Sequence, residues 1–454
     1  MNLKDVVPLK QIDVRAAVRD WIHGGRRGYM AAGLLALVAG LFAIRLDDAR
    51  GDRALDAERA RLAAAEQARL DSIAAAGAIG SLGVVPVAKP EHVRALYLNA
   101  WAAGSPRKLA KLIDIANRTD INAFVIDVKE GGEISYLSEV DLAGKIGAHR
   151  EYIKNVRGVL SRLKENRIYP IARIVVFKDP VLAQAKPELA IQNQDGSLWL
   201  DNKGKAWVDS YNKKVWDYNI ALAREAVKLG FAEVQWDYVR FPDAPRSYLA
   251  RAVYPAAANR TKPDAIREFM LYAREQLADL DVPVTADVFG LTVTTQGDMG
   301  IGQQWEKMVD AVDVILPMVY PSHFIRGNYG LSNPNAVPYR TIRRSMEDAI
   351  TRSKAVPNAA TIRPWLQAFT LGPPRYTPAH VWAQIQAVYD SGLKEWVLWS
   401  PGSNYDPAAL AAEDGSAPQY AIPGGTGESE PAPAASRPKA DGLLGSPVRT
   451  DTIR

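Results

Sequence analysis

Residues 90–410 alternate between two hydrophobic periodicities, and this alternation limits the chain to a small number of folds. Short apolar runs of strand length occur at residues 94–100, 123–130, 169–177, 233–239, 282–290, 312–320, 363–369 and 395–400. Longer stretches with helical spacing lie between most of them, at 105–118, 213–230, 263–280 and 377–392. Eight strands that alternate with about eight helices are typical of an α/β chain folded as a (β/α)8 TIM barrel. We therefore predict a barrel over residues 90–410.

A doubly wound open sheet is the rival architecture for the same alternation. That fold binds dinucleotides or phosphates through a glycine-rich loop after its first strand. The first apolar run, 94–100, is followed by "WAAGSP", which is not such a loop. The barrel is therefore the favoured interpretation.

The segment before the barrel predicts attachment to a membrane. Residues 1–27 form a polar, basic arm, and residues 28–45 contain an uncharged apolar run from Tyr29 to Ile44. A cleaved signal peptide and a buried core helix compete with a signal anchor, but no small-x-small cleavage site follows the run. A transmembrane signal anchor over 28–45 is favoured. The basic arm predicts a cytoplasmic N-terminus, so we expect a single-pass protein of the cell membrane with its main domain extracytoplasmic.

Two further segments flank the barrel. Residues 46–89 begin with an Ala-, Arg- and Glu-rich stretch that predicts a helical stalk, followed by a linker into the barrel. Residues 411–454 are rich in Ala, Pro, Gly and Ser, and such a sequence cannot bury enough apolar surface to fold. We expect this tail to be disordered.

The composition excludes several classes of chemistry. Cysteine is absent, which rules out disulfides, thiolate metal sites and cysteine nucleophiles, and the five histidines are scattered without metal-ligand spacing. The formal net charge is +5, but the basic residues are spread along the chain and form no stripe typical of nucleic-acid binding. We expect no metal, no cofactor and no nucleic-acid partner.

Polar and aromatic side chains cluster where the predicted strands end. In a TIM barrel the active site lies at the carboxyl ends of the strands. The residues at these ends are Asp127, Lys129, Glu130, Arg173, Gln235, Asp237, Arg240, Asp287, Tyr320, His323, Trp365, Gln367 and Trp399. Strand alternation puts Gln235 and Asp237 on one face. The pattern predicts a single site to which several strands contribute.

Several of these residues also fit structural roles. Asp127, Lys129 and Glu130 fit a solvated loop with internal ion pairs, and Arg173 and Arg240 fit simple neutralisation of neighbouring acids. The tryptophans fit the core, and the histidine fits a hydrogen bond at the edge of the site. A Schiff-base role for Lys129 or Lys178 is a further alternative.

Paired carboxylates are the main chemical resource that remains. Glycoside hydrolysis needs two of them, because one protonates the leaving oxygen while the other acts as nucleophile or base. A nearby arginine keeps one carboxylate ionised, and apolar or like-charged surroundings raise the pKa of the other. Aromatic side chains offer apolar faces to sugar rings, and the chain has 11 Trp and 18 Tyr.

Six ordered segments resemble a family of glycoside hydrolase domains related to the alpha-amylase-like barrels. They are "RALYLNAWAAGS", "FVIDVKEGGEISY", "VQWDYVRFPD", "ADVFG", "LPMVYPSHF" and "PWLQAF". The resemblance extends over residues 92–408 and implies a TIM barrel that acts on carbohydrate. In related barrels the end of strand four carries the nucleophile, which implies that role for Asp237. The acid/base comes from strand five or a later one, and Asp287 is the matching carboxylate.

Two departures from the amylase pattern limit what the resemblance implies. Amylases have a Glu at the strand-five position, and the Arg two residues before their nucleophile is Gln235 here. Amylase-type alpha-retaining chemistry is therefore not carried over. Asp127 or Glu130 stays open as the second carboxylate.

The resulting hypothesis is a membrane-anchored glycoside hydrolase of poly- or oligosaccharides. Asp237 is the predicted nucleophile or base and Asp287 the predicted acid, and the other residues of the cluster are expected to position these acids or contact the sugar. A catalytically inactive carbohydrate-binding or cell-envelope scaffold barrel is one rival, and a lysine-dependent lyase is another. Carbohydrate is the expected partner, and the N-terminal helix is the expected contact with the membrane.

Overall fold

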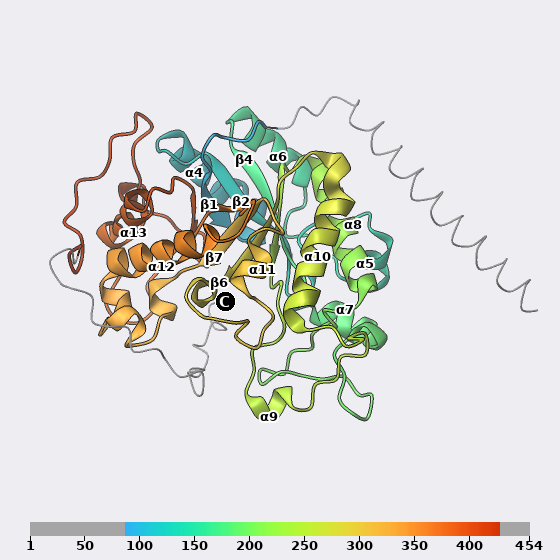
Figure 1. Cartoon of the computed structure of the whole chain (residues 1–454). Helices are drawn as coiled ribbons and strands as arrows, with labels where there is room; N and C mark the ends of the chain where they lie inside the picture. Colours follow the sequence, from blue (N-terminus) through green and yellow to red (C-terminus); the bar gives the residue numbers. More distant parts are fainter. Residues whose placement is uncertain (1–86, 427–454) are drawn as a thin grey trace, which may run out of the picture. The chain divides into compact units, whose positions relative to one another are not determined.

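The computed structural model describes residues 87–426, and Figure 1 shows helices around a set of central strands. The predicted arm 1–27, the anchor 28–45 and the stalk up to residue 86 lie outside the described residues, as does the end of the chain from residue 427. Between residues 87 and 426, no helix is both long enough and apolar enough to span a bilayer. The membrane segment stays a prediction.

Eight parallel strands form the closed barrel that the alternation predicts. They are β1 Arg94–Leu98, β2 Ala123–Glu130, β4 Tyr169–Val175, β5 Glu233–Asp237, β6 Val284–Phe289, β7 Val314–Met318, β9 Trp365–Gln367 and β10 Trp396–Trp399. Each strand pairs with the next in this order, and β10 pairs with β1, so the sheet closes on itself. The predicted barrel is confirmed, and each predicted apolar run supplies one of its strands.

Two short strands lie outside this set. β3 (Glu133–Ile134) pairs antiparallel with the end of β2, and β8 (Thr361–Ile362) pairs with β7 just before β9 begins. The seventh position in the barrel is therefore occupied by two short strands, β8 and β9, because Arg363 and Pro364 interrupt the strand.

Helices connect the strands and follow the predicted helical stretches. The α-helices are α3 Ala100–Gly104, α4 Pro106–Asn117, α5 Asp141–Lys145, α6 Val156–Glu165, α7 Pro180–Ala185, α8 Lys213–Leu229, α9 Arg246–Leu249, α10 Lys262–Leu277, α11 Trp305–Met308, α12 Pro338–Ser353 and α13 Pro378–Asp390. Short 3-10 helices lie at Pro187–Leu189, Ala278–Leu280, Gly290–Val293, Pro321–His323, Asn328–Gly330, Pro334–Ala336 and Pro407–Ala409. Polar caps fix several helix starts: Ser105, Asn212 and Thr261 each accept a hydrogen bond from a first-turn amide, in α4, α8 and α10.

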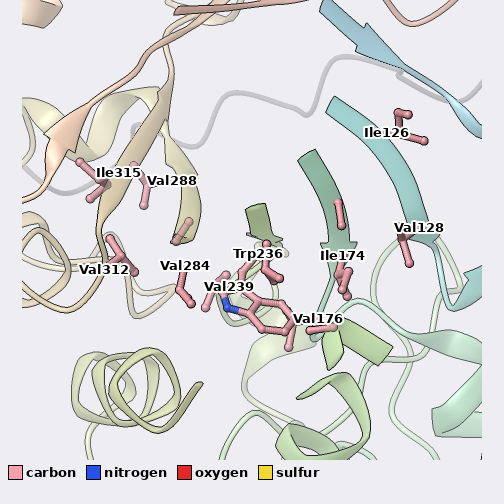
Figure 2. Close-up of a cluster of buried hydrophobic side chains, with 14 of the residues drawn as sticks. Ile126, Val128, Ile174, Val176, Trp236, Val239, Val284, Val288, Val312 and Ile315 are labelled. Atoms are coloured by element: carbon pink, nitrogen blue, oxygen red, sulfur yellow. The ribbon is translucent and has the colours of Figure 1, made fainter. Parts of the chain in front are cut away.

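Two apolar clusters lie on the two sides of the barrel wall. The inner cluster fills the barrel and includes Val125, Ile171 and Leu316. The outer cluster lies between strands and helices, and Figure 2 shows members of it on successive strands: Ile126, Ile174, Trp236, Val288 and Ile315. Neighbouring residues of one strand thus alternate between the two clusters, because a parallel sheet covered by helices is buried on both faces.

The ordered domain extends beyond the predicted boundary at residue 411. The backbone amide of Asp120 donates to the carbonyl oxygen of Ala411 at 3.0 Å, and Ile422 packs against the outer apolar cluster. Residues 411–426 therefore lie against the barrel, which corrects the predicted start of the disordered tail. A few anchoring contacts hold this stretch, and its Pro- and Gly-rich composition does not reveal them.

Candidate active site

Arg173 is the centre of the polar cluster at the carboxyl ends of the strands. Its guanidinium contacts three carboxylates: Nη1 is 2.5 Å from Asp127 and 2.8 Å from Glu130, and Nη2 is 2.5 Å from Asp237. The sheet register pairs Arg173 with Asp127 on one side and with Gln235 on the other. The ends of β2, β4 and β5 thus bring these predicted residues together.

Asp237 is the last residue of β5, and its charge is balanced by Arg173. Arg173 donates to its Oδ2 through Nε at 3.0 Å and Nη2 at 2.5 Å, and the backbone amide of Tyr238 donates to Oδ1 at 2.5 Å. Tyr238 has a φ of +51°, in the left-handed region that bulky residues seldom adopt. Backbone strain of this kind gathers at functional sites, because the surrounding structure must hold it in place.

Asp287 belongs to the same cluster but has a different environment. Gln235 Nε2 donates to its two carboxyl oxygens at 2.9 and 3.1 Å, and Trp365 Nε1 donates to Oδ1 at 2.7 Å. Its side chain has no exposed surface, and the Nε of Arg173 is 4.0 Å away. Burial and the neighbouring charge of Asp237 raise the pKa of Asp287 well above its ordinary value.

Asp127 and Glu130 complete the acidic set, and they differ in exposure. Asp127 is buried, and the Tyr97 hydroxyl donates to its Oδ2 at 2.5 Å. Burial raises the pKa of Asp127 to about 6. The side chain of Glu130 is 48% exposed, which makes it the acid of the cluster that solvent reaches most easily.

Tyr97 is a site residue that the sequence analysis missed. Besides its bond to Asp127, its ring lies 5.8 Å from the guanidinium carbon of Arg173. The signal was present in the first apolar run, because strand alternation gives Tyr97 the same inward face as Ala95.

A β-bulge in β2 decides which side chains reach Arg173. The register with β4 shifts between Asp127 and Lys129, so that Asp127 pairs with Arg173 while Lys129 pairs with the outward-facing Ile174. Regular alternation predicts that Asp127 and Lys129 share a face, with Glu130 on the opposite one. The bulge reverses this arrangement, so that Lys129 turns outward and Glu130 returns to the site.

Lys129 therefore lies outside the site, which corrects its predicted contact with the substrate. Its side chain has no exposed surface, and its Nζ is 2.7 Å from Asp179 Oδ2 and 2.8 Å from Asn219 Oδ1. The Tyr218 ring lies 5.3 Å from the same nitrogen. Asn219 and Tyr218 belong to α8, so Lys129 links the barrel wall to a helix.

Three other predicted residues are buried beneath the site and hold its side chains and loops in place. Gln235, Trp365 and Gln367 are fully buried, so a direct contact with the substrate does not fit their positions. Gln235 and Trp365 hold Asp287, as described above. Gln367 accepts a hydrogen bond from the backbone amide of Ser322 at 3.0 Å and so fixes the loop after β7.

Aromatic side chains stand beside the acids. The rings of Tyr320 and Trp399 are 4.8 Å apart, Phe369 lies 4.9 Å from Trp399, and His323 lies 5.3 Å from Tyr320. Burial and the charge of Asp287 raise the pKa of Tyr320, so its hydroxyl remains a hydrogen-bond donor. Trp399 and Phe369 are partly exposed, as a stacking surface for a sugar ring requires.

Arg240 is held by aromatic rings. Its guanidinium carbon lies 5.1 Å from the Trp207 ring, 4.8 Å from Tyr238 and 4.5 Å from Phe289. Its Nη1 donates to the carbonyl oxygen of Phe241 at 2.9 Å. Arg173, Gln235 and Arg240 were all predicted to position the acids. Arg173 contacts Asp127, Glu130 and Asp237, and Gln235 bonds Asp287, whereas the close contacts of Arg240 are with rings and a carbonyl oxygen.

The acidic cluster is not arranged as a metal site. In the part of the chain that the structure describes, no group of three or more His, Asp or Glu side chains is placed to hold an ion. The positive charge among the carboxylates is supplied by Arg173.

A family model described as "Putative glycosyl hydrolase domain" matches residues 95–405, which include nearly the whole barrel. The chain belongs to this family. The match confirms the resemblance drawn from the ordered motifs and covers every acid of the cluster. A comparison with curated proteins gives no match.

Several solved structures are similar to this glycosyl hydrolase domain. A hypothetical protein from Ruminiclostridium thermocellum ATCC 27405 is 42% identical over 42% of this chain and 97% of its own, with a TM-score of 0.40. The PgaB (BpsB) glycoside hydrolase domain from Bordetella bronchiseptica is 15% identical over 69% of this chain and 95% of its own, with a TM-score of 0.48. The alpha-galactosidase TtGalA from Thermus thermophilus is 14% identical over 72% of this chain and 61% of its own, with a TM-score of 0.45.

Proposed function

We propose that this domain hydrolyses glycosidic bonds of a poly- or oligosaccharide, with Asp237 as nucleophile or base and Asp287 as proton donor. The observation that carries the proposal is the unequal sharing of Arg173. The guanidinium contacts Asp237 at 2.5 and 3.0 Å but lies 4.0 Å from Asp287. Two carboxyl groups in one site thus have opposite electrostatic surroundings, which is the condition for one to act as base and the other as acid.

The difference between the two acids supports a division of roles. Arg173 stabilises the negative charge of Asp237, so this group is suited to attack a sugar carbon or to activate water. Asp287 has a raised pKa because of burial and the charge of Asp237. A raised pKa favours the protonated form of a carboxyl group, and that form can donate its proton to the leaving oxygen.

Glu130 is the alternative proton donor, because exposure favours it. Its side chain is 48% exposed and lies 2.8 Å from the same Arg173, whereas the Asp287 side chain has no exposed surface. In this alternative, Asp287 only tunes the charge of the site. The partly exposed Trp399 would serve as a stacking face for the sugar in either case.

The primary test is Asp237→Asn, which keeps the shape of the side chain but removes its charge. Reducing-sugar release from a panel of polysaccharides should fall by about 10³-fold or more, with glycan binding retained. The matched control is Asp114→Asn on α4, whose side chain is 59% exposed and pairs only with Arg118 among the residues of the structure. Wild-type turnover that survives in Asp237→Asn would contradict the assignment.

The dependence of the hydrolysis rate on the leaving group distinguishes the two candidate proton donors, Asp287 and Glu130. When the true donor is removed, hydrolysis of natural glycosides should fall by about 10² to 10⁴-fold, because their alkoxide leaving groups need a proton. Aryl glycosides with an acidic phenol should be much less affected. We expect this split for Asp287→Asn, and its appearance in Glu130→Gln instead would move the acid role to Glu130.

A catalytically inactive carbohydrate-binding barrel is the second candidate, and the complete burial of Asp287 favours it. Its signature would be glycan binding by the wild-type chain with no turnover on any polysaccharide that binds. A lysine-dependent lyase that uses Lys129 loses support, because this residue is buried and paired with Asp179 at 2.7 Å. A carbonyl substrate cannot reach that amine.

We further propose that residues 28–45 anchor the domain to the cell membrane, with the barrel extracytoplasmic. The support is the uncharged apolar run preceded by a basic arm. Retention of the full-length chain in the membrane fraction at alkaline pH, and its release when residues 1–45 are deleted, would be the expected result.

A further inference from the structure

Two cations at the carboxyl ends of the strands have no acidic partner. Lys178 follows β4 and Arg240 follows β5, and among residues 87–426 no carboxylate oxygen lies within 4.0 Å of either charged group. The carboxylates with the largest electrostatic effect on Arg240 are those of Asp243 and Asp237. Asp243 is exposed, and Asp237 is already bound by Arg173. The positive charge here is therefore uncompensated at close range.

The two cations lie on one aromatic ring next to the proposed nucleophile. Lys178 Nζ is 4.9 Å and the guanidinium carbon of Arg240 is 4.8 Å from the ring centroid of Tyr238. Tyr238 directly follows Asp237 in the chain. The left-handed backbone of Tyr238, at φ +51°, fixes where this ring stands relative to the acid.

The environment of Arg240 is unusual for a buried arginine. The side chains of Arg173 and Arg363 are also buried, and each contacts two or more carboxylates. Arg240 is 8% exposed and has aromatic rings and one carbonyl oxygen instead. Cation–π contacts offset only part of the free energy that burying an ion costs. An anionic ligand group would supply the missing counter-charge.

We propose that Lys178 and Arg240 bind a carboxylate on the sugar, so that the substrate is an acidic glycan that contains uronic-acid or comparable carboxyl-bearing residues. This inference rests on the proposed function, because it assumes that a glycan occupies the site beside Asp237. The planar fork of an arginine matches the two oxygens of a carboxylate, and a lysine adds a mobile point charge. Lys178 is partly exposed and meets the ligand from the solvent side, while Arg240 holds it from the protein side.

The test is an array of glycans in matched acidic and neutral pairs, probed with the detergent-solubilised full-length chain carrying Asp237→Asn to prevent turnover. Each uronic-acid glycan is paired with its carboxyl-reduced form, and sulfated glycans form a third arm. We expect binding of carboxyl-bearing glycans that weakens with salt. Added Arg240→Gln or Lys178→Gln should each weaken it by about tenfold or more, with Arg240→Lys recovering part of the loss.

Controls keep the result interpretable. Arg118→Gln removes an exposed surface charge on α4 and should leave binding unchanged. Melting temperatures identify a misfolded variant, and Lys178→Gln tests the site without disturbing the buried Arg240. Three outcomes would each overturn the inference but not the proposed function. The first is equal binding of acidic and neutral glycans, and the second is a preference for sulfated glycans. The third is full binding of acidic glycans by folded Lys178→Gln and Arg240→Gln. Binding of no glycan at all would overturn the proposed function as well.

Discussion

At the scale of single residues, the chemistry of the site depends on how one guanidinium is shared among acids. Arg173 bonds directly to Asp127, Glu130 and Asp237, and it approaches Asp287 only to 4.0 Å. Each acid also differs in burial and in its other donors. Four carboxyl groups of similar intrinsic acidity thus have different electrostatic surroundings in one site, and this difference is what acid–base catalysis requires.

Asp127 gives a pH signature that can be measured in the folded protein. Burial raises its pKa from 3.8 to about 6, so the folded state binds the proton more tightly than the unfolded chain does. The stabilisation is fully present below about pH 4 and is lost as the pH rises through about 6. Melting temperatures from pH 4 to 7 should show this fall, and Asp127→Asn should flatten it.

Asp120 limits how far Asp127→Asn flattens the pH dependence of the melting temperature. Burial raises its pKa to about 6 as well, so it contributes with the same sign and some pH dependence should remain in Asp127→Asn. Asp114→Asn, on the exposed face of α4, is the matched control and should keep the wild-type profile. Superimposable profiles for wild type and Asp127→Asn would contradict the assigned shift.

At the scale of elements, the bulge in β2 separates what the sequence predicts from what it does not. Periodicity identified the strand, and the fold places its end at the site. The face of each later side chain depends on one shifted backbone register between Asp127 and Lys129, which no residue type in "AFVIDVKE" announces. Strand alternation placed Gln235 on the face of Asp237, and a core position was one of the two roles open to Trp365. That both side chains hold Asp287 was not predictable, because their depth in the barrel depends on where strands begin relative to one another.

Lys129→Met tests the outward position of Lys129. Its removal leaves Asp179 as a buried charge without its partner at 2.7 Å, so the free energy of unfolding should fall by about 3–5 kcal/mol in urea denaturation. Turnover per folded molecule should be unchanged. Lys145→Met is the control, because that exposed pair with Asp141 should be worth less than about 1 kcal/mol. Loss of turnover with stability retained would return Lys129 to the site.

At the scale of the whole barrel, a second ionic cluster joins strands at the end opposite to the acids around Arg173. Arg363, just before β9, contacts Glu233 at the start of β5 at 2.6 Å and Glu395 just before β10 at 2.8 Å. These residues lie at the amino ends of the strands, where the side chains of TIM barrels contribute to stability rather than to catalysis. The closed sheet itself was predictable, because eight apolar runs permit few arrangements. The partners of Arg363 were not, because 130 residues separate it from Glu233 along the chain.

Arg363→Met should therefore destabilise the barrel without changing its chemistry. Two buried carboxylates would lose their partner, and the free energy of unfolding should fall by about 3–5 kcal/mol. The kcat/KM of the remaining folded protein should match that of the wild type. Arg343→Met, which breaks an exposed pair with Glu347 on α12, is expected to change stability by less than about 1 kcal/mol. A large fall in kcat/KM for Arg363→Met would show that the two ends of the barrel are coupled.

The extra residue in β2 also bears on how relatives of this chain are aligned. A relative that lacks Val128 could keep an unbroken ladder in this strand and still turn the same two acids toward its arginine. Asp127 and Glu130 would then stand two positions apart instead of three. An alignment without a one-residue gap at this point would pair Glu130 with a residue of the relative that neighbours its acid and has different chemistry. The acid that the relative retains would then be mistaken for a lost one.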